Sequence, residues 1–270
     1  MIAAELRPPR AELATTEGMD AWIDTYHAVR RLTRGGTFVC LTDNAVGAQE
    51  EDNLRHLVIN IGKDVPLGRI VPFLTTKHSL EYCLSYAERA YQHGFRSLVI
   101  LGGDKTVGPK RVVSHAWELR EILRQHNSGL ELGGWANPHA DAERQVDYMV
   151  DAHYCAQFYL TQVVSHYDAA RVSRFLEAAD KRGMSLPGLF GVFYYRSANR
   201  KTLETLKGFL PVPIEGLVEE FGSGATAEDI CARTIRALLD AGAKHFYISN
   251  LPVGKAHITL ANILEKAGVR

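Results

Sequence analysis

The sequence predicts an α/β protein, a single (β/α)8 TIM barrel that forms one catalytic domain over residues 1–270. Short apolar runs, clusters of small or polar residues, and amphipathic stretches follow one another in the same order eight times along the chain. Strands that alternate with helices pair in parallel with right-handed crossovers. A length of 270 residues without a low-complexity linker fits one such barrel. An open doubly wound sheet is the alternative, because periodicity alone does not show closure.

The apolar runs are the expected strands, and the amphipathic stretches are the expected helices. The strands are Ile2–Leu6, Thr37–Leu41, Arg69–Leu74, Ser97–Leu101, Leu130–Trp135, Cys155–Leu160, Leu189–Phe193 and His245–Ser249. The helices are Met19–Arg34, Glu50–Ile61, Ser79–His93, Ser114–His126, Ala140–His153, Tyr167–Arg182, Arg200–Phe209, Ala227–Ala241 and Lys255–Ala267, with further helix after Pro213. In the third of them, apolar residues follow i, i+3, i+4 spacing, Ser79 is a suitable N-cap, and Gly94 is a suitable stop.

The composition argues against several classes of protein. Lys plus Arg and Asp plus Glu both total 31, so a nucleic-acid partner is not expected. The N-terminus has no apolar signal region and no run of 18 apolar residues occurs, which indicates a cytoplasmic protein with no membrane partner. The separated cysteines Cys40, Cys83, Cys155 and Cys231 are interpreted as reduced, buried residues. No metal site is expected, and the oligomeric state is left open.

The candidate site lies at the carboxyl ends of the strands, where barrels of this class carry their chemistry. Polar or aromatic residues at these ends include Glu5, Thr42, Asp104, Trp135, His139, Gln157, Tyr195 and Asn250. Glu5 is the most informative, because a carboxylate in an apolar strand is costly unless it is paired, protonated or near solvent. Partial burial raises the pKa of a carboxyl group, which suits a general acid. An ion pair with Arg7 or Arg10 is the alternative.

The other candidates leave two interpretations open. Asp104 follows two glycines that allow the backbone to approach a ligand closely, or it caps the next segment. Gln157 lies in an apolar run, and because a buried amide needs partners, it either binds a ligand or bridges neighbouring strands. His139 is a candidate for acid/base chemistry or a solvated loop residue.

Several of these segments match a known set of motifs in the right order. A-E-L-R-P-P-R at residues 4–10 is similar to F-E-F-F-P-P-R, and L-G-G-D at 101–104 is similar to L-R-G-D. A-Q-F-Y at 156–159 is similar to T-Q-F-F-F, P-G-L at 187–189 to P-G-I-L-P, and H-F-Y at 245–247 to H-F-Y. Together they resemble the methylenetetrahydrofolate reductase family over nearly the whole chain.

The resemblance implies reduction of 5,10-methylenetetrahydrofolate to 5-methyltetrahydrofolate. By position, Glu5 matches the general acid that opens the five-membered ring to an iminium, and Asp104 matches a carboxylate that binds the pterin. Gln157 matches the amide that orients folate and the hydride donor, and Tyr195 matches a stacking aromatic. Asn250 is placed on the substrate side; Thr42, Trp135 and His139 are placed on the cofactor side together with Gln157 and Tyr195.

The departures from the family pattern concern the flavin. The family's arginine before Gly-Asp is Gly102 here, a lysine near the flavin phosphates is Met149, and an arginine in the eighth strand region is Leu251. The segment after the fifth strand is also shorter. Since a pyrophosphate needs donors or positive charge, we expect no bound FAD and direct hydride delivery by NADH, with NADPH as the second choice. The alternatives are an FAD- or deazaflavin-dependent reductase, a folate-binding methyltransferase and a non-catalytic relative.

Overall fold

The structure, a computed structural model, describes residues 1–9, 13–43, 64–104, 108–126 and 129–269. Eight parallel strands close into a barrel in sequence order. They are β1 (Ile2–Leu6), β2 (Phe38–Leu41), β3 (Ile70–Thr75), β4 (Ser97–Leu101), β5 (Glu131–Ala136), β6 (Phe158–Val164), β7 (Gly188–Phe193) and β8 (His245–Ser249). Strand β1 pairs with both β2 and β8, so the barrel prediction is confirmed and the open sheet is excluded.

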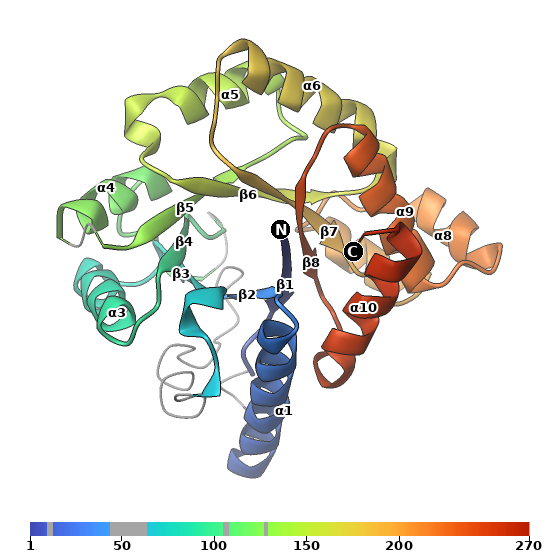
Figure 1. The fold of residues 1–270 in the computed structure, drawn as a ribbon, viewed down its shortest axis with the longest axis horizontal. Helices are drawn as coiled ribbons and strands as arrows, with labels where there is room; N and C mark the ends of the chain where they lie inside the picture. The colour runs from blue at the N-terminus through green and yellow to red at the C-terminus, as the bar shows by residue number, and fades with distance from the viewer. Residues whose placement is uncertain (10–12, 44–63, 105–107, 127–128, 270) are drawn as a thin grey trace.

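Helices surround the barrel (Figure 1). They are α1 (Thr15–Arg34), α3 (Leu80–Gln92), α4 (Ala116–His126), α5 (Ala142–Val150), α6 (Ala169–Lys181), α7 (Arg200–Lys207), α8 (Ile214–Gly222), α9 (Ala227–Asp240) and α10 (Ala256–Ala267). Short 3-10 turns include η3 (Ala152–Tyr154) and η4 (His166–Asp168). Ser79 is the predicted N-cap, and its hydroxyl accepts a hydrogen bond from the backbone N–H of Tyr82. The helix predicted at Glu50–Ile61 lies outside the described residues.

The barrel interior is filled by one apolar cluster, and a second layer lies between strands and helices. The interior cluster contains Ala3, Cys40, Val71, Phe73, Val99, Leu160, Leu189 and Tyr247. Side chains alternate between the two faces of a strand. Glu5 follows Ala3 by two positions, and Ser249 follows Tyr247 by two positions, so both face the interior. They lie at the carboxyl end of the barrel, which we call the mouth.

Strand β6 is where the predicted boundaries are wrong. The strand runs over Phe158–Val164 rather than Cys155–Leu160, whereas the other predicted strands agree within one residue at each end. Leu160 pairs with Leu189 and Val163 pairs with Gly191, so β6 holds one extra residue between these pairs. This is a β-bulge, which breaks the period-2 alternation on which strand prediction depends. The polar residues Thr161 and Gln162 in the bulge interrupt the apolar run, so the predicted strand ended at Leu160 although β6 continues to Val164.

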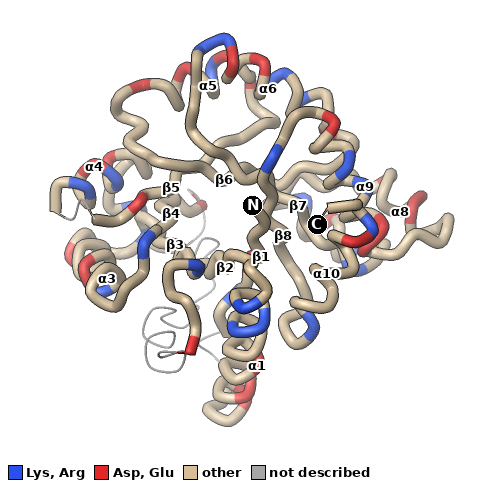
Figure 2. Tube along the Cα trace, in the orientation of Figure 1, with Lys and Arg blue, Asp and Glu red and all other residues tan. Residues whose placement is uncertain are grey.

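The structure also bears on the expectations for surface charge, the cysteines, metal sites and membrane spans. Residues of both signs are interspersed on the outer helices, for example on α5 and α6 (Figure 2). Cys40, Cys83 and Cys231 are free and buried as predicted, but Cys155 is only partly buried and accepts a hydrogen bond from Arg124. Among the described residues, no group of His, Cys, Asp and Glu is placed to hold a metal ion. In the same part of the chain, no helix has the length and apolar character needed to cross a membrane.

Candidate active site

Glu5 lies at the mouth as predicted. Its side chain is partly buried, and Oε1 accepts a 2.7 Å hydrogen bond from the hydroxyl of Ser249 at the end of β8. Burial, and after it the negative charge of Glu5, raises the pKa of Cys40 and that of Tyr247, both of which lie deeper in the barrel. The thiol and the phenol therefore keep their protons, and Glu5 is the carboxyl group of this cluster.

The bulge in β6 presents Gln162 at the carboxyl-terminal part of that strand. The Thr161 hydroxyl accepts from the N–H of Gly191 (3.1 Å), and the Gln162 side-chain oxygen accepts from the N–H of Val163 (2.9 Å). These two side chains substitute for regular ladder bonds that the extra residue disrupts. The Tyr247 hydroxyl donates to the Thr161 carbonyl (2.6 Å) across Gly191, where a Cβ would lie 2.5 Å from that hydroxyl. The bulge is thus fixed from inside the barrel.

Gln157 lies at the opposite end of the barrel, so its predicted placement at the mouth is wrong. It precedes β6, and its side-chain oxygen accepts a 2.7 Å hydrogen bond from the N–H of Leu132, near the start of β5. Its own N–H donates to the Leu132 carbonyl (2.9 Å). The structural alternative, in which this amide bridges neighbouring strands, is therefore the one observed. Gln157 and Gln162 both interrupt an apolar run in the sequence, and only the bounds of β6 show which of them lies at the mouth.

Asp104 follows β4 at the mouth, after two glycines. Gly103 has φ +69°, and a Cβ there would lie 2.7 Å from Cε of Lys77. Thr76 donates a 3.0 Å hydrogen bond to the Gly102 carbonyl, which joins the ends of β3 and β4. Lys77 is 6% exposed, and sequence reasoning passed it over. Its position two residues beyond the end of β3 is the feature of the sequence that could have identified Lys77 as a mouth residue.

A second acidic group lies at the ends of β2 and β3. Asp43 accepts hydrogen bonds from the N–H (2.7 Å) and hydroxyl (3.0 Å) of Thr75, and Nε2 of His78 lies 2.8 Å from its Oδ2. The His78 ring stacks on Tyr82 with 4.5 Å between centroids. Thr42, placed on the cofactor side by sequence, is partly buried beside Asp43. The Asp43–His78 pair was not predicted, because neither residue interrupts an apolar strand.

Trp135 and His139 follow or end β5. Trp135 is partly buried and packs against the cluster inside the barrel. His139 Nε2 donates a 2.9 Å hydrogen bond to the carbonyl of Val163, and Nδ1 lies 3.7 Å from Oδ1 of Asp168. The imidazole therefore connects β5 to the end of β6. The contribution of Trp135 and His139 to cofactor binding stays a prediction.

Tyr195 and Asn250 are more enclosed than the sequence suggested. Tyr195 is 6% exposed, its ring centroid lies 4.8 Å from that of Phe193, and burial raises the pKa of its phenol. It has little free ring surface for stacking on a ligand, so that role stays a prediction that would require the ring to move. Asn250 has φ +66°, and its Nδ2 donates 2.9 Å to the Tyr194 carbonyl. Its amide therefore joins the ends of β7 and β8.

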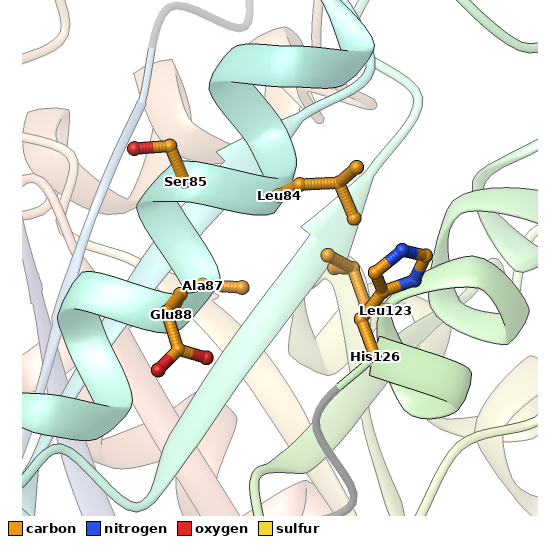
Figure 3. Close-up of a pocket in the computed structure, with 6 residues that line it drawn as sticks. All are labelled: Leu84, Ser85, Ala87, Glu88, Leu123 and His126. Atoms are coloured by element: carbon orange, nitrogen blue, oxygen red, sulfur yellow. The ribbon is translucent and has the colours of Figure 1, made fainter.

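A groove of about 290 Å³ also occurs away from the mouth. It lies between α3 and α4 and is lined by Leu84, Ser85, Ala87, Glu88, Leu123 and His126 (Figure 3). Glu88 in this groove accepts a hydrogen bond from Gln92 one helical turn further on. Because barrel chemistry collects at strand ends and not between helices, we place the candidate active site at the mouth.

Comparison with known proteins decides the family. A profile of methylenetetrahydrofolate reductase matches residues 1–265. The chain belongs to the methylenetetrahydrofolate reductase family. No curated protein sequence matches it significantly.

Solved structures agree with this family's barrel. An uncharacterized protein from Clostridium thermocellum, which binds two copies of 5-methyl-5,6,7,8-tetrahydrofolic acid, is similar with a TM-score of 0.72 and 15% identity. The match covers 99% of this chain and 93% of that one. An F420-dependent secondary alcohol dehydrogenase in complex with an F420-acetone adduct has a TM-score of 0.57 and 14% identity, with 98% of each chain covered. At these identities the likeness shows the fold alone.

The structure also bears on which segment corresponds to the family motif at strand six. The family's T-Q-F-F-F shares Thr and Gln with T-Q-V-V at residues 161–164, and it shares Gln and Phe with A-Q-F-Y at residues 156–159. Gln162 also lies within β6, on the side of the mouth. The motif alone does not separate the two glutamines, but only Gln162 lies at the mouth, so Gln162 is the candidate that the structure favours.

Proposed function

We propose that this chain reduces 5,10-methylenetetrahydrofolate to 5-methyltetrahydrofolate, with hydride delivered directly from NADH and without bound flavin. NADPH is the second donor to test. The single observation that carries the proposal is the partly buried carboxyl of Glu5, held by Ser249 at the mouth of a barrel whose chain matches this family from residue 1 to 265. Asp104 and Gln162 lie at the same end of the barrel.

The proposed reaction uses one proton and one hydride. Protonated Glu5 gives its proton to N10 of the folate as the bond between N10 and the methylene carbon breaks, which leaves a cationic iminium at N5. Hydride from C4 of NADH then adds to the methylene carbon and gives the methyl product and NAD⁺. The Asp104 carboxylate stabilises the cation through its charge. Among the described residues, the side-chain nitrogen of Gln162 donates no hydrogen bond, so it is free to bind a carbonyl of folate or nicotinamide.

Two observations support a donor other than a bound flavin. Met149 and Leu251, which stand where the family resemblance implies cations, are each 2% exposed and belong to the core between strands and helices. Neither side chain offers a hydrogen-bond donor or a charge to a phosphate. These positions do not fit the pyrophosphate of FAD, and the proposal therefore uses no step through flavin.

The test is a visible spectrum of the purified protein followed by an anaerobic assay of NADH oxidation with methylenetetrahydrofolate. We expect a colourless protein whose folate-dependent NADH oxidation is lost in Glu5→Gln and kept in the exposed control Glu17→Gln. A yellow protein whose rate follows its flavin content would contradict direct transfer while leaving the reductase. Binding of 5-methyltetrahydrofolate without turnover by any nicotinamide or flavin would favour the methyltransferase or the non-catalytic relative.

A further inference from the structure

The space beside Gly102 is occupied by the guanidinium of Arg111. A Cβ added to Gly102 would lie 2.8 Å from Cζ of Arg111 and 2.9 and 3.0 Å from its Nη2 and Nη1. Gly102 stands where the family pattern has an arginine. The positive charge missing from the strand is therefore supplied to the same place by a residue nine positions further along the chain, and the glycine makes room for it.

Arg111 is held in place mainly through backbone groups. Its Nη2 donates to the carbonyl of Gly103, and the N–H of the next residue, Val112, donates a 2.7 Å hydrogen bond to the Thr76 carbonyl at the end of β3. The guanidinium is partly buried, and its Nε is buried without a hydrogen-bond partner among the described residues. Within the same part of the chain, no carboxylate forms an ion pair with it. A partly buried cation without a counter-anion is costly.

An anionic ligand at the mouth would remove that cost. Arg111 lies against Gly102, and Lys77 lies against Gly103, the next residue of the turn. Asp104 follows directly. The two cations therefore lie against the turn that places the carboxylate assigned to the substrate. A guanidinium presents paired donors that match the oxygens of a phosphate.

We propose that Arg111 binds the pyrophosphate of the dinucleotide hydride donor at the end of β4, in place of the arginine that the strand lacks. This assignment rests on the proposed function in its choice of donor. The assignment also explains why position 102 is a glycine. Any side chain there would collide with the guanidinium of Arg111.

The test uses ADP-ribose, which carries the pyrophosphate without the nicotinamide. Calorimetric titrations of the full chain with ADP-ribose, NADH, FAD and 5-methyltetrahydrofolate compare wild type with Arg111→Gln, Arg111→Lys and the control Arg34→Gln. Arg34 is an exposed residue at the end of α1, just before β2 begins at the end of the barrel away from the mouth. Loss of a charged hydrogen bond predicts about 10- to 100-fold weaker binding of ADP-ribose and NADH by Arg111→Gln. Arg111→Lys should lose less, and folate binding should not change.

A charge swap tests the explanation of Gly102. In the Arg111→Ala background the space beside position 102 is empty, so adding Gly102→Arg should restore most of the ADP-ribose affinity. Equal ADP-ribose affinity of wild type and Arg111→Gln, or no ADP-ribose binding by wild type, would overturn the assignment. So would an equal loss of folate affinity, which would assign Arg111 to the folate carboxylates.

The outcomes also separate this assignment from the proposed function. Arg111-dependent binding of ADP-ribose without NADH oxidation would keep the assignment and reject the reductase. If FAD binds and its affinity depends on Arg111, the assignment of Arg111 to a pyrophosphate is kept and the flavin-free reaction is rejected.

Discussion

The hydroxyl of Ser249, the last residue of β8, donates a 2.7 Å hydrogen bond to Oε1 of Glu5 on β1, 244 positions away in sequence. Closure of the barrel brings the two together, because β1 pairs with β8 as its final neighbour. A hydroxyl donor of this kind fixes the orientation of a carboxyl group. The proposed proton donor is therefore positioned by a side chain from β8, the strand that closes the barrel against β1.

Replacing Ser249 by Ala should lower kcat about 10-fold, because one orienting hydrogen bond to Glu5 is lost. The KM for NADH should stay unchanged. Ser97→Ala is the matched control, since Ser97 also donates to a carboxylate, that of Glu131, but at the start of β4. Steady-state kinetics on both variants check this, and a wild-type kcat for Ser249→Ala would remove Ser249 from the site.

The two glutamines at strand six should separate activity from stability. Gln162→Ala should lower kcat/KM by about 10-fold or more, because a ligand-binding amide at the mouth is lost. Gln157→Ala should leave kcat unchanged and lower the free energy of unfolding by about 1 kcal/mol, because the N–H of Leu132 loses its partner. Kinetics and urea unfolding measure the two effects. The reverse pattern would restore Gln157 to the active site.

The sequence predicted eight strands and the place of Glu5, because these depend on local alternation and strand order. The number of strands favoured closure, but only the pairing of β1 with β8 shows it. It misplaced the glutamine, since the bulge between Leu160 and Val163 breaks the alternation that defines a strand. The Asp43–His78 pair and the position of Arg111 beside Gly102 were also out of reach. They depend on which loops meet across neighbouring strand ends, and no local pattern contains that information.

A partly buried histidine, His166, predicts how the stability of the protein varies with pH. His166 Nε2 lies 3.0 Å from Oε1 of Glu220, and Nδ1 lies 3.1 Å from the Thr234 hydroxyl. Burial lowers the pKa of His166, and this outweighs the opposing charge of Glu220. Because the folded protein then binds a proton less readily than the unfolded chain, this contribution to stability is present above about pH 6.5 and is lost as pH falls below that value.

His166→Asn should therefore reduce the difference in unfolding free energy between pH 7.5 and pH 5.5. Urea unfolding at the two pH values measures it, with His93→Asn, an exposed residue at the end of α3, as the control. If the difference between the two pH values is unchanged in His166→Asn, His166 does not titrate in this way.

The central claim is direct hydride transfer from NADH to the folate, and isotope transfer tests it most directly. The purified protein would be given NADH deuterated at C4, in each stereoisomer, with methylenetetrahydrofolate in ordinary water under anaerobic conditions. Mass spectrometry then reads the methyl group of the product. The account predicts that one stereoisomer places its deuterium in the methyl group of 5-methyltetrahydrofolate, at a rate that does not respond to added FAD. A methyl group without deuterium from either stereoisomer, formed only when flavin is present, would contradict it.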